Sequence, residues 1–255
     1  MQNLSIPAGN FILSAWLHEG ASPAAPCLVI CHGFCGSPEG GSSFEIAEVL
    51  QKHNIAVLRF SFSPHASLSQ QVAEIGAVIN HCRINPSSRI ALLGRSMGAA
   101  ASLVFAAANP GLTGLCLMAS PADLSATFSG ILGEDYTRLE NGHPVTVFHE
   151  NQPVHLTPEF IRDLKKYDLP GAISSLSGLP ILLVHGLEDD TVPVEHGRRL
   201  YSAAAMPKRL LLLPGVKHTF TGMATRFVPE LTDWLTNEVF RKHPFENSTA
   251  GRCSL

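Results

Sequence analysis

The sequence is poor in charged residues and has no long apolar run. Charged residues make up 15% of the chain, its net charge is −3, and no block of like charges occurs. A nucleic acid or an anionic membrane is therefore not an expected partner. No stretch approaches the ~20 apolar residues that span a bilayer, and the first residues lack the features of a secretory signal. These absences predict a soluble, cytoplasmic protein.

The cysteines do not form a recognisable metal-ligand pattern. Among the six, Cys27, Cys31 and Cys35 are separated by three residues each, which differs from the paired spacing of zinc sites. Cys27, Cys31 and Cys116 lie in apolar runs, where a thiol packs as a small hydrophobic group. We therefore predict no metal site and no cofactor. Cys35 follows His32-Gly33-Phe34 in a turn-rich loop. It is either a modifiable thiol or, as we favour, an inert packing residue.

The sequence does contain a regular alternation of apolar runs and amphipathic segments. Its 45% of hydrophobic residues suffice for a sizeable core. Runs typical of buried strands occur at Cys27–Cys31, Ile55–Phe60, Ile90–Leu93, Leu115–Met118, Ile181–His185 and Arg209–Leu213. Helical patterns include Ser43–His53, Gln71–Cys82, Glu195–Ala205 and Thr225–Arg241. This order predicts an α/β fold with a mostly parallel central sheet and helices on both faces.

The segment 122–177 interrupts this alternation. It contains a predicted hairpin, Val145–Phe148 against Val154–Leu156, and a predicted helix at Pro158–Lys166. An insertion of this length is too long for a simple connection between two strands, so we predict a cap or lid after the sixth strand. The predicted boundaries are 1–121 and 178–242 for a single core domain, 122–177 for the cap and 243–255 for a flexible tail.

A glycine–serine turn stands at the centre of the alternation. The run Ile90–Leu93 leads into Gly94-Arg95-Ser96-Met97-Gly98, and an alanine-rich helical segment follows. A strand, a Gly-x-Ser-x-Gly turn and a helix together form the setting of a nucleophile elbow, which exposes the serine hydroxyl at the sheet edge. Gly94 and Gly98 lack a Cβ and so allow the strand and the helix to approach each other. The pattern predicts Ser96 as a nucleophile.

Candidate partners for Ser96 follow later strands of the same sheet. Functional groups in open parallel sheets gather at the carboxyl ends of the strands, and a serine needs a base oriented by a carboxylate. Asp189 follows the run Ile181–His185, and His218 follows Arg209–Leu213. Chains with this elbow carry the order serine, acid, histidine, so we predict Ser96, Asp189 and His218 as a catalytic triad. Three rival acids stay open by sequence alone: Asp123, Glu188 and Asp190.

The loop after Cys27–Cys31 supplies a candidate oxyanion hole. It begins His32-Gly33-Phe34. We predict that the backbone N–H groups of Phe34 and Met97 stabilise a developing oxyanion, to which such donors contribute ~3 kcal/mol each. The alternative for Gly33 is that it only forms the turn that ends the strand. We predict that His32 orients this loop and does not take part in the reaction itself.

Four motifs resemble, in order and spacing, those of the α/β-hydrolase superfamily. They are His32-Gly33-Phe34, Gly94-Arg95-Ser96-Met97-Gly98, His185-Gly-x-x-Asp189-x-x-Val-Pro and Pro214-Gly-x-x-His218. The chain is most similar to intracellular esterases and acyl hydrolases of the cinnamoyl/feruloyl esterase type, which carry a comparable insertion with a hairpin. The loop Ser61–Ser67 departs from many relatives, because it is short and lacks their glycines. Substrate shape is therefore not carried over from them.

The resemblance implies a carboxylesterase-like serine hydrolase that acts on small to medium acyl esters. A non-catalytic ligand-binding protein of the same fold is one alternative, and an acyltransferase, thioesterase or peptidase with the same triad is another. The expected partner is a small-molecule ester, and no oligomeric state is predicted. Four aromatic residues of the predicted cap either line an acyl pocket or form the core of the cap: Phe128, Tyr136, Phe148 and Phe160.

Overall fold

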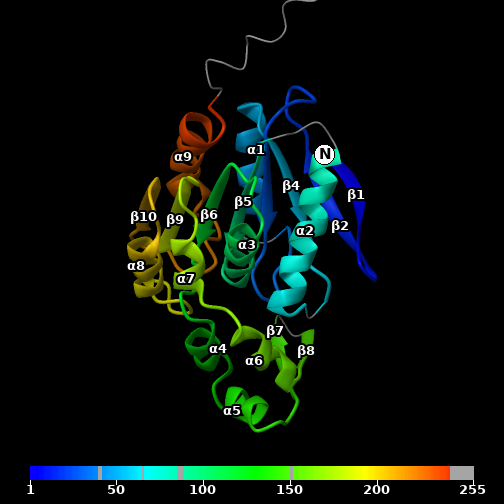
Figure 1. Ribbon diagram of the computed structural model, residues 1–255, viewed down its shortest axis with the longest axis vertical. Helices are drawn as coiled ribbons and strands as arrows, with labels where there is room; N and C mark the ends of the chain where they lie inside the picture. Colours follow the sequence, from blue (N-terminus) through cyan, green and yellow to red (C-terminus); the bar gives the residue numbers. More distant parts are fainter. Residues whose placement is uncertain (40–41, 65, 85–88, 150–151, 242–255) are drawn as a thin grey trace, which may run out of the picture.

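A mostly parallel sheet runs through the middle of the computed structural model (Figure 1). The residues described are 1–39, 42–64, 66–84, 89–149 and 152–241. The strands of this sheet, in spatial order, are β1 (Gln2–Ala8), β2 (Phe11–His18), β4 (Ala56–Phe60), β3 (Cys27–Cys31), β5 (Ile90–Arg95), β6 (Gly114–Met118), β9 (Ile181–Gly186) and β10 (Lys208–Leu213). Only the pairs β1–β2 and β2–β4 are antiparallel among these described strands. The predicted α/β fold is confirmed.

Helices cover both faces of this sheet (Figure 1). One face carries α2 (Leu68–Ile84), α3 (Met97–Ala108), α7 (Leu169–Ser174) and α8 (Val194–Ala203). The other face carries α1 (Ser43–Lys52) and α9 (Ala224–Trp234), which the π-helical turn η1 (Leu235–Val239) continues. Among the described residues, no helix is both long and apolar enough to cross a membrane. The predicted tail at 243–255 lies outside the described residues.

The side chains of the central strands divide between two cores. In β3, Cys27, Val29 and Cys31 contribute to the core that contains α2 and α3, whereas Leu28 and Ile30 contribute to the core that contains α1 and α9. Successive side chains of a strand point to opposite faces of the sheet. Because both faces are covered, every residue of β3 is buried, and this is why the strand is a continuous apolar run in the sequence.

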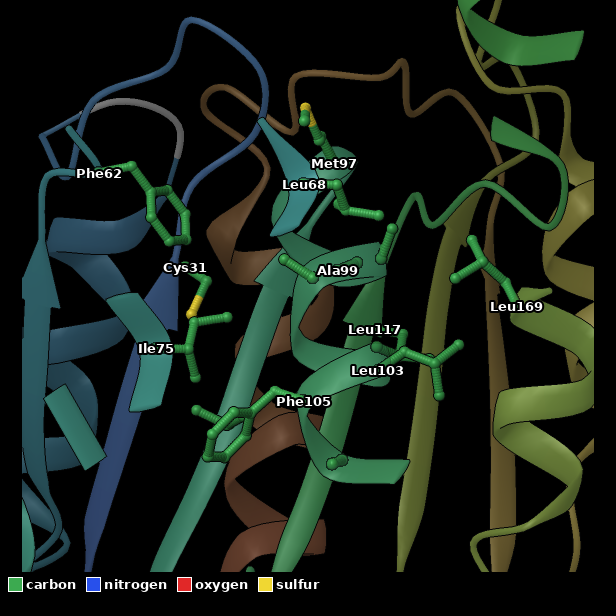
Figure 2. Packing of buried hydrophobic residues seen from close by; sticks show 14 of the residues in the cluster. Cys31, Phe62, Leu68, Ile75, Met97, Ala99, Leu103, Phe105, Leu117 and Leu169 are labelled. Carbon is green, nitrogen blue, oxygen red and sulfur yellow. The ribbon is translucent and has the colours of Figure 1, made fainter. Parts of the chain in front are cut away.

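The alanine-rich helix α3 lies in the middle of its face, between α2 and α7. Figure 2 shows Ala99, Leu103 and Phe105 of α3, with Ile75 of α2 on one side and Leu169 of α7 on the other. Small side chains at the start of α3 allow it to lie close to the sheet, and Ala99 is fully buried. This packing fixes the first turn of α3, which directly follows Ser96.

The insertion after β6 lies at one end of the sheet (Figure 1). Its elements are α4 (Leu124–Leu132), α5 (Glu134–Glu140), β7 (Val145–His149), β8 (Gln152–Leu156) and α6 (Pro158–Leu164), after which α7 returns the chain to the sheet. The predicted hairpin is present, because β7 and β8 pair antiparallel; its residues 150–151 lie outside the described residues. The chain therefore leaves the sheet at the carboxyl end of one parallel strand and builds the insertion there.

The four aromatic residues predicted in the insertion differ in burial. Phe128, Tyr136 and Phe160 are buried and belong to the same core as α2 and α3, whereas Phe148 is 71% exposed. The rings of Phe128 and Phe160 also contact the ring of Phe34, with centroids 5.3 and 5.6 Å away. Phe128, Tyr136 and Phe160 are thus part of the hydrophobic core. Phe128 and Phe160 also connect the insertion to the loop after β3.

Candidate active site

Ser96 occupies a strained turn between β5 and α3. Its backbone angles are φ 55° and ψ −122°, a region that costs a non-glycine residue about 1–3 kcal/mol. The N–H group of Ser96 donates to the carbonyl of Met118 at 2.9 Å, and its carbonyl accepts from the N–H groups of Ala99 and Ala100. Bonds to β6 and to α3 therefore hold the strained residue from both sides.

Close backbone contacts require the two glycines of this turn. A Cβ added to Gly98 would lie 2.2 Å from the carbonyl oxygen of His32 and 2.6 Å from that of Cys31. A Cβ added to Gly94 would lie 2.4 Å from the carbonyl oxygen of Gly98. These separations are far shorter than van der Waals contact, so neither position accepts a side chain. The glycines bring the end of β3 against the turn that carries Ser96.

The side chains of Ser96, His218 and Asp189 form a hydrogen-bonded chain. His218 Nε2 lies 3.0 Å from Ser96 Oγ, and His218 Nδ1 lies 2.9 Å from Asp189 Oδ2 and 3.1 Å from Asp189 Oδ1. Because a carboxylate only accepts, Nδ1 carries the proton and Nε2 presents its lone pair to the serine hydroxyl. The loops after β5, β9 and β10 thus bring together a nucleophile, a base and an orienting acid.

The environment of Asp189 keeps its carboxylate ionised. Burial alone would raise the pKa of this carboxyl group, but hydrogen bonds from His185, from His218 and from the N–H of Val192 outweigh burial and hold the pKa well below its usual value. The N–H groups of Thr191 and Val192 donate to Oδ1 at 3.0 and 2.8 Å. A carboxylate fixed in this way can orient an imidazole and stabilise its protonated form.

The three rival acids have other surroundings. Asp123 is the N-cap of α4, where its Oδ1 accepts the N–H of Ala126 at 2.9 Å. Glu188 accepts the N–H of Gly215 at 2.5 Å, and Asp190 is exposed. Within the described part of the chain, none of the three hydrogen-bonds to the histidine that faces Ser96. The geometry thus places Asp189, the acid that the motif favours, and none of its three rivals beside His218.

Two side chains that the sequence did not single out hold the loop of His218. Arg95 donates to the carbonyl of Thr219 at 3.0 Å, and Ser42 donates from Oγ to the carbonyl of Phe220 at 2.8 Å. Arg95 stands at a variable position of the Gly-x-Ser-x-Gly motif, and Ser42 precedes α1, so neither position carries a sequence signal for this contact. These bonds link the elbow and the start of α1 to the histidine loop.

His32 ties the loop after β3 to the residues after β4. The N–H of Phe62 donates to His32 Nε2 at 3.1 Å, so Nδ1 carries the ring proton and donates to the carbonyl of Gly33 at 2.8 Å. Burial lowers the pKa of His32 to about 4, which agrees with a neutral ring in this arrangement. His32 therefore connects two loops and makes no bond to Ser96 or His218 among the described contacts.

The low pKa of His32 predicts a loss of stability in acid. Folding lowers this pKa from 6.5 to about 4, so between these values the unfolded chain binds a proton that the folded chain does not. The free energy of unfolding should therefore fall as the pH drops from 6.5 towards 4, by up to about 3 kcal/mol from this residue. Urea unfolding of wild type and His32→Gln at several pH values measures the difference. Equal slopes for the two proteins would contradict the prediction.

The residues of the two predicted oxyanion donors both belong to segments next to Ser96. Met97 is the first residue of α3, where backbone N–H groups have no intrahelical acceptor. Phe34 lies in a turn closed by a bond from the N–H of Gly36 to the carbonyl of Gly33 at 3.0 Å. A Cβ built on Gly33 would be 3.7 Å from Ser96 Oγ, so this turn directly adjoins the serine.

Cys35 lies in the same turn and remains protonated at neutral pH. Burial raises the pKa of its thiol to about 11, and its backbone has φ 51°. Its side chain packs against the core that contains α2 and α3. A protonated, packed thiol fits the packing interpretation of Cys35 better than that of a reactive group.

A cavity of about 420 Å³ opens beside this turn, and we call it the loop cavity. Its walls come from the turn after β3, the residues between β4 and α2, the first turn of α2, and the β7–β8 hairpin: 32–36, 62–64, 66, 71, 149 and 152–154. A larger hollow of about 590 Å³ is lined by Cys27 and Ala56, the first residues of β3 and β4. It lies at the amino ends of the strands, whereas ligands of such sheets bind at the carboxyl ends.

The fold and this site define the class of the protein as an α/β hydrolase. The solved structure of Est1E from Butyrivibrio proteoclasticus is similar with a TM-score of 0.80 and 18% identity, over 94% of this chain and 100% of that one. Est1E with ferulic acid bound gives a TM-score of 0.79, with 17% identity over 93% of this chain and 100% of that one. At these identities the similarity concerns the fold.

The chain belongs to the Esterase family, whose model matches residues 65–235. Esterase YjfP of Escherichia coli strain K12 is 27% identical over 242 residues, which cover 86% of this chain and 89% of that protein. YfhR of the same organism is 43% identical over 54 residues, a segment that covers 21% of this chain and 19% of YfhR. The resemblance to α/β-hydrolase esterases that the motifs carry is thereby confirmed.

Proposed function

We propose that this protein is a serine hydrolase that cleaves carboxylic esters of small to medium acyl groups. The observation that carries the proposal is the hydrogen-bonded chain from Ser96 through His218 to Asp189, on a strained turn at the carboxyl ends of the strands. Membership of the Esterase family supports an ester as the bond that is cleaved. The proposed reaction uses side chains and backbone groups of this chain and requires no cofactor.

The first proposed step forms an acyl-enzyme. Ser96 Oγ attacks the carbonyl carbon of the ester while His218 Nε2 takes the hydroxyl proton. The N–H groups of Phe34 and Met97 bond to the carbonyl oxygen as it becomes negative. His218 then gives its proton to the oxygen of the leaving alcohol, the ester C–O bond breaks, and the acyl group stays on Ser96. Asp189 remains ionised throughout and stabilises the protonated imidazole.

The second proposed step releases the acid. A water molecule gives a proton to His218 Nε2 as its oxygen attacks the acyl carbon, and the oxyanion again lies on the two backbone N–H groups. The proton returns to Ser96 Oγ as the acyl C–O bond breaks. One ester and one water thus give one acid and one alcohol, and the side chains end in their starting states.

We further propose that the segment 122–177 acts as a cap on the core formed by 1–121 and 178–242. The packing of Phe34 against Phe128 and Phe160 supports this proposal, because it joins the insertion to a predicted oxyanion donor. The loop cavity of about 420 Å³ falls within the range of ~300–1,000 Å³ that is usual for small ligands. A small-molecule ester is therefore the proposed partner, and the bound ferulic acid of Est1E supports this size class.

Labelling with a fluorophosphonate tests the proposal, because this probe reacts with a serine that a neighbouring base activates. We expect the wild type to gain the mass of one phosphonyl group, and Ser96→Ala to gain none. Intact-protein mass spectrometry measures both. Unlabelled wild type that is folded by circular dichroism would contradict the proposal, provided that a small probe such as methyl fluorophosphonate also fails to react.

A further inference from the structure

The loop that carries His218 is tied to its neighbours by backbone bonds at its start but not around the histidine. The N–H of Glu188, in the loop after β9, donates to the carbonyl of Val216 at 3.2 Å. From Lys217 to Phe220, the backbone bonds among the described residues stay within the loop. One of them is long, from the N–H of Phe220 to the carbonyl of Lys217 at 3.4 Å. The position of His218 therefore depends on other contacts.

Two side chains from outside the loop hold the two residues that follow His218. Arg95 donates to the carbonyl of Thr219 at 3.0 Å. Ser42, which is buried, donates from Oγ to the carbonyl of Phe220 at 2.8 Å. Phe220 has φ 57°, in the left-handed region, where a bulky residue stays only if its surroundings hold it. The two donors thus fix a strained segment directly beside the histidine.

Arg95 reaches this loop from the face of the sheet that carries α1 and α9. Leu93, two residues earlier in β5, belongs to the core on that face, and alternate residues of a strand share a face. A small cavity of about 20 Å³ is lined by Arg95, Ser42 and Phe220, so both donors approach the loop from the same side. Because Arg95 directly precedes Ser96, its side chain connects the elbow of the nucleophile to the loop of the base.

The charge of Arg95 has no partner of opposite sign nearby. Within the described ranges, Arg95 forms no ion pair. Burial lowers the pKa of its guanidinium, because a charge removed from water loses solvation. A partly buried cation without a counter-ion costs stability. Stability alone therefore does not explain an arginine at this position, whereas its bond to the loop of His218 does.

We propose that Arg95 and Ser42 are positioning residues, which hold the backbone after His218 so that Nε2 of this histidine stays 3.0 Å from Ser96 Oγ. The inference rests on the proposed ester hydrolysis and adds two residues that act through the base. Neither one bonds to a reacting atom. A displacement of about 1 Å in a reacting group can lower a rate about 100-fold, so the loss of either donor should be visible in the rate.

Removing the guanidinium tests the proposal. Arg95→Met keeps a long side chain but no donor, so we expect kcat for a p-nitrophenyl ester to fall about 30-fold. The rate of labelling by the fluorophosphonate should fall by about the same factor, because His218 acts in both reactions. KM should change less than about 2-fold, since Arg95 does not bind the substrate. A wild-type kcat, or a loss that appears in KM alone, would overturn the proposal.

Ser42→Ala removes the second donor. The kcat and the labelling rate should again fall together, by about 10-fold, with KM unchanged. All variants are assayed below their unfolding temperature, and Ser42→Ala carries the test if Arg95→Met does not fold. Wild-type rates in Ser42→Ala would overturn the role of Ser42.

Arg226→Met is the matched control. Arg226 also donates to a carbonyl of this loop, that of Pro214 at 3.1 Å, but four residues before His218. We expect Arg226→Met to keep kcat within about 2-fold of the wild type. A loss as large as that of Arg95→Met would overturn the proposal, because it would show that any weakening of the loop has the same effect.

A measurement on the histidine ring separates this inference from the proposed reaction. The proton on His218 Nδ1, which faces Asp189 Oδ2 at 2.9 Å, gives an NMR signal in protein labelled with ¹⁵N-histidine, and the loss of that signal in His218→Gln assigns it. We expect this proton to exchange with water about 10-fold faster in Arg95→Met than in the wild type. An unchanged exchange rate would overturn the role of Arg95. Faster exchange, together with a wild type that the fluorophosphonate leaves unlabelled, would overturn only the proposed hydrolysis.

Discussion

Ser96→Ala and His218→Ala are each expected to lower kcat for ester hydrolysis by roughly a million-fold, and the double variant is expected to lose no more than either single variant. The nucleophile and its base act as one unit, because Ser96 Oγ can attack only as His218 Nε2, 3.0 Å away, takes its proton. Removing either group removes the same step. Hydrolysis of a p-nitrophenyl ester, followed by absorbance, measures all three variants.

The residual rate of these variants is the informative quantity. Phe34 and Met97 would still offer their N–H groups to an oxyanion, so we expect slow hydrolysis above the uncatalysed rate. Equal stability of the variants and the wild type in urea would serve as the control for folding. Losses that add in the double variant would show that Ser96 and His218 act in separate steps and would contradict the proposed triad.

Asp189→Asn is expected to lower kcat by about 10⁴-fold while it leaves the fold intact. The asparagine oxygen can still accept the N–H groups of Thr191 and Val192, which hold Asp189 Oδ1. Its amide nitrogen, however, replaces Asp189 Oδ2, which lies 2.9 Å from His218 Nδ1, and it donates to Nδ1 there instead of accepting; the oxygen at the Oδ1 position, 3.1 Å away, is the longer of the two contacts. The imidazole would then favour the other tautomer, with the proton on the nitrogen that faces Ser96.

Asp123→Asn is the matched control for this prediction. Asp123 caps α4 through its Oδ1, and asparagine caps helices about as well as aspartate. We therefore expect kcat to change less than about 2-fold and the free energy of unfolding by less than about 0.5 kcal/mol. A severe loss in Asp123→Asn, with a mild one in Asp189→Asn, would transfer the role of the acid to Asp123.

The sequence was sufficient for the order of the elements and for the position of the elbow. Strands that are covered on both faces must be apolar throughout, so β3, β5, β6 and β9 were visible as short continuous runs. The elbow could be recognised in the sequence because close backbone contacts near the serine require its two glycines. Gly94 lies against the backbone of Gly98, within the same turn. Gly98 lies against the backbone at the end of the neighbouring strand β3.

The motif favoured Asp189 over its neighbours, but which carboxylate lies against His218 is visible only in the tertiary structure. Asp189 and its neighbours Glu188 and Asp190 have the same chemistry and nearly the same place in the chain. Their side chains nevertheless have different surroundings, because the loop turns Asp189 inward, where its side chain is fully buried against His218. The direction of a side chain in a loop depends on contacts with distant strands, and local sequence patterns do not record it.

The aromatic residues of the insertion and the polar group of the loop cavity also depended on the tertiary structure. Phe128 and Phe160 meet Phe34, and Gln71 lines the loop cavity from the first turn of α2, a helix whose sequence pattern indicates only an apolar side. The chain alone thus determined the fold class and the reactive turn, since these follow from periodicity and from short-range steric limits. The surroundings of the site were decided by packing between segments far apart in the chain, because there the shape of the whole molecule determines which side chains meet.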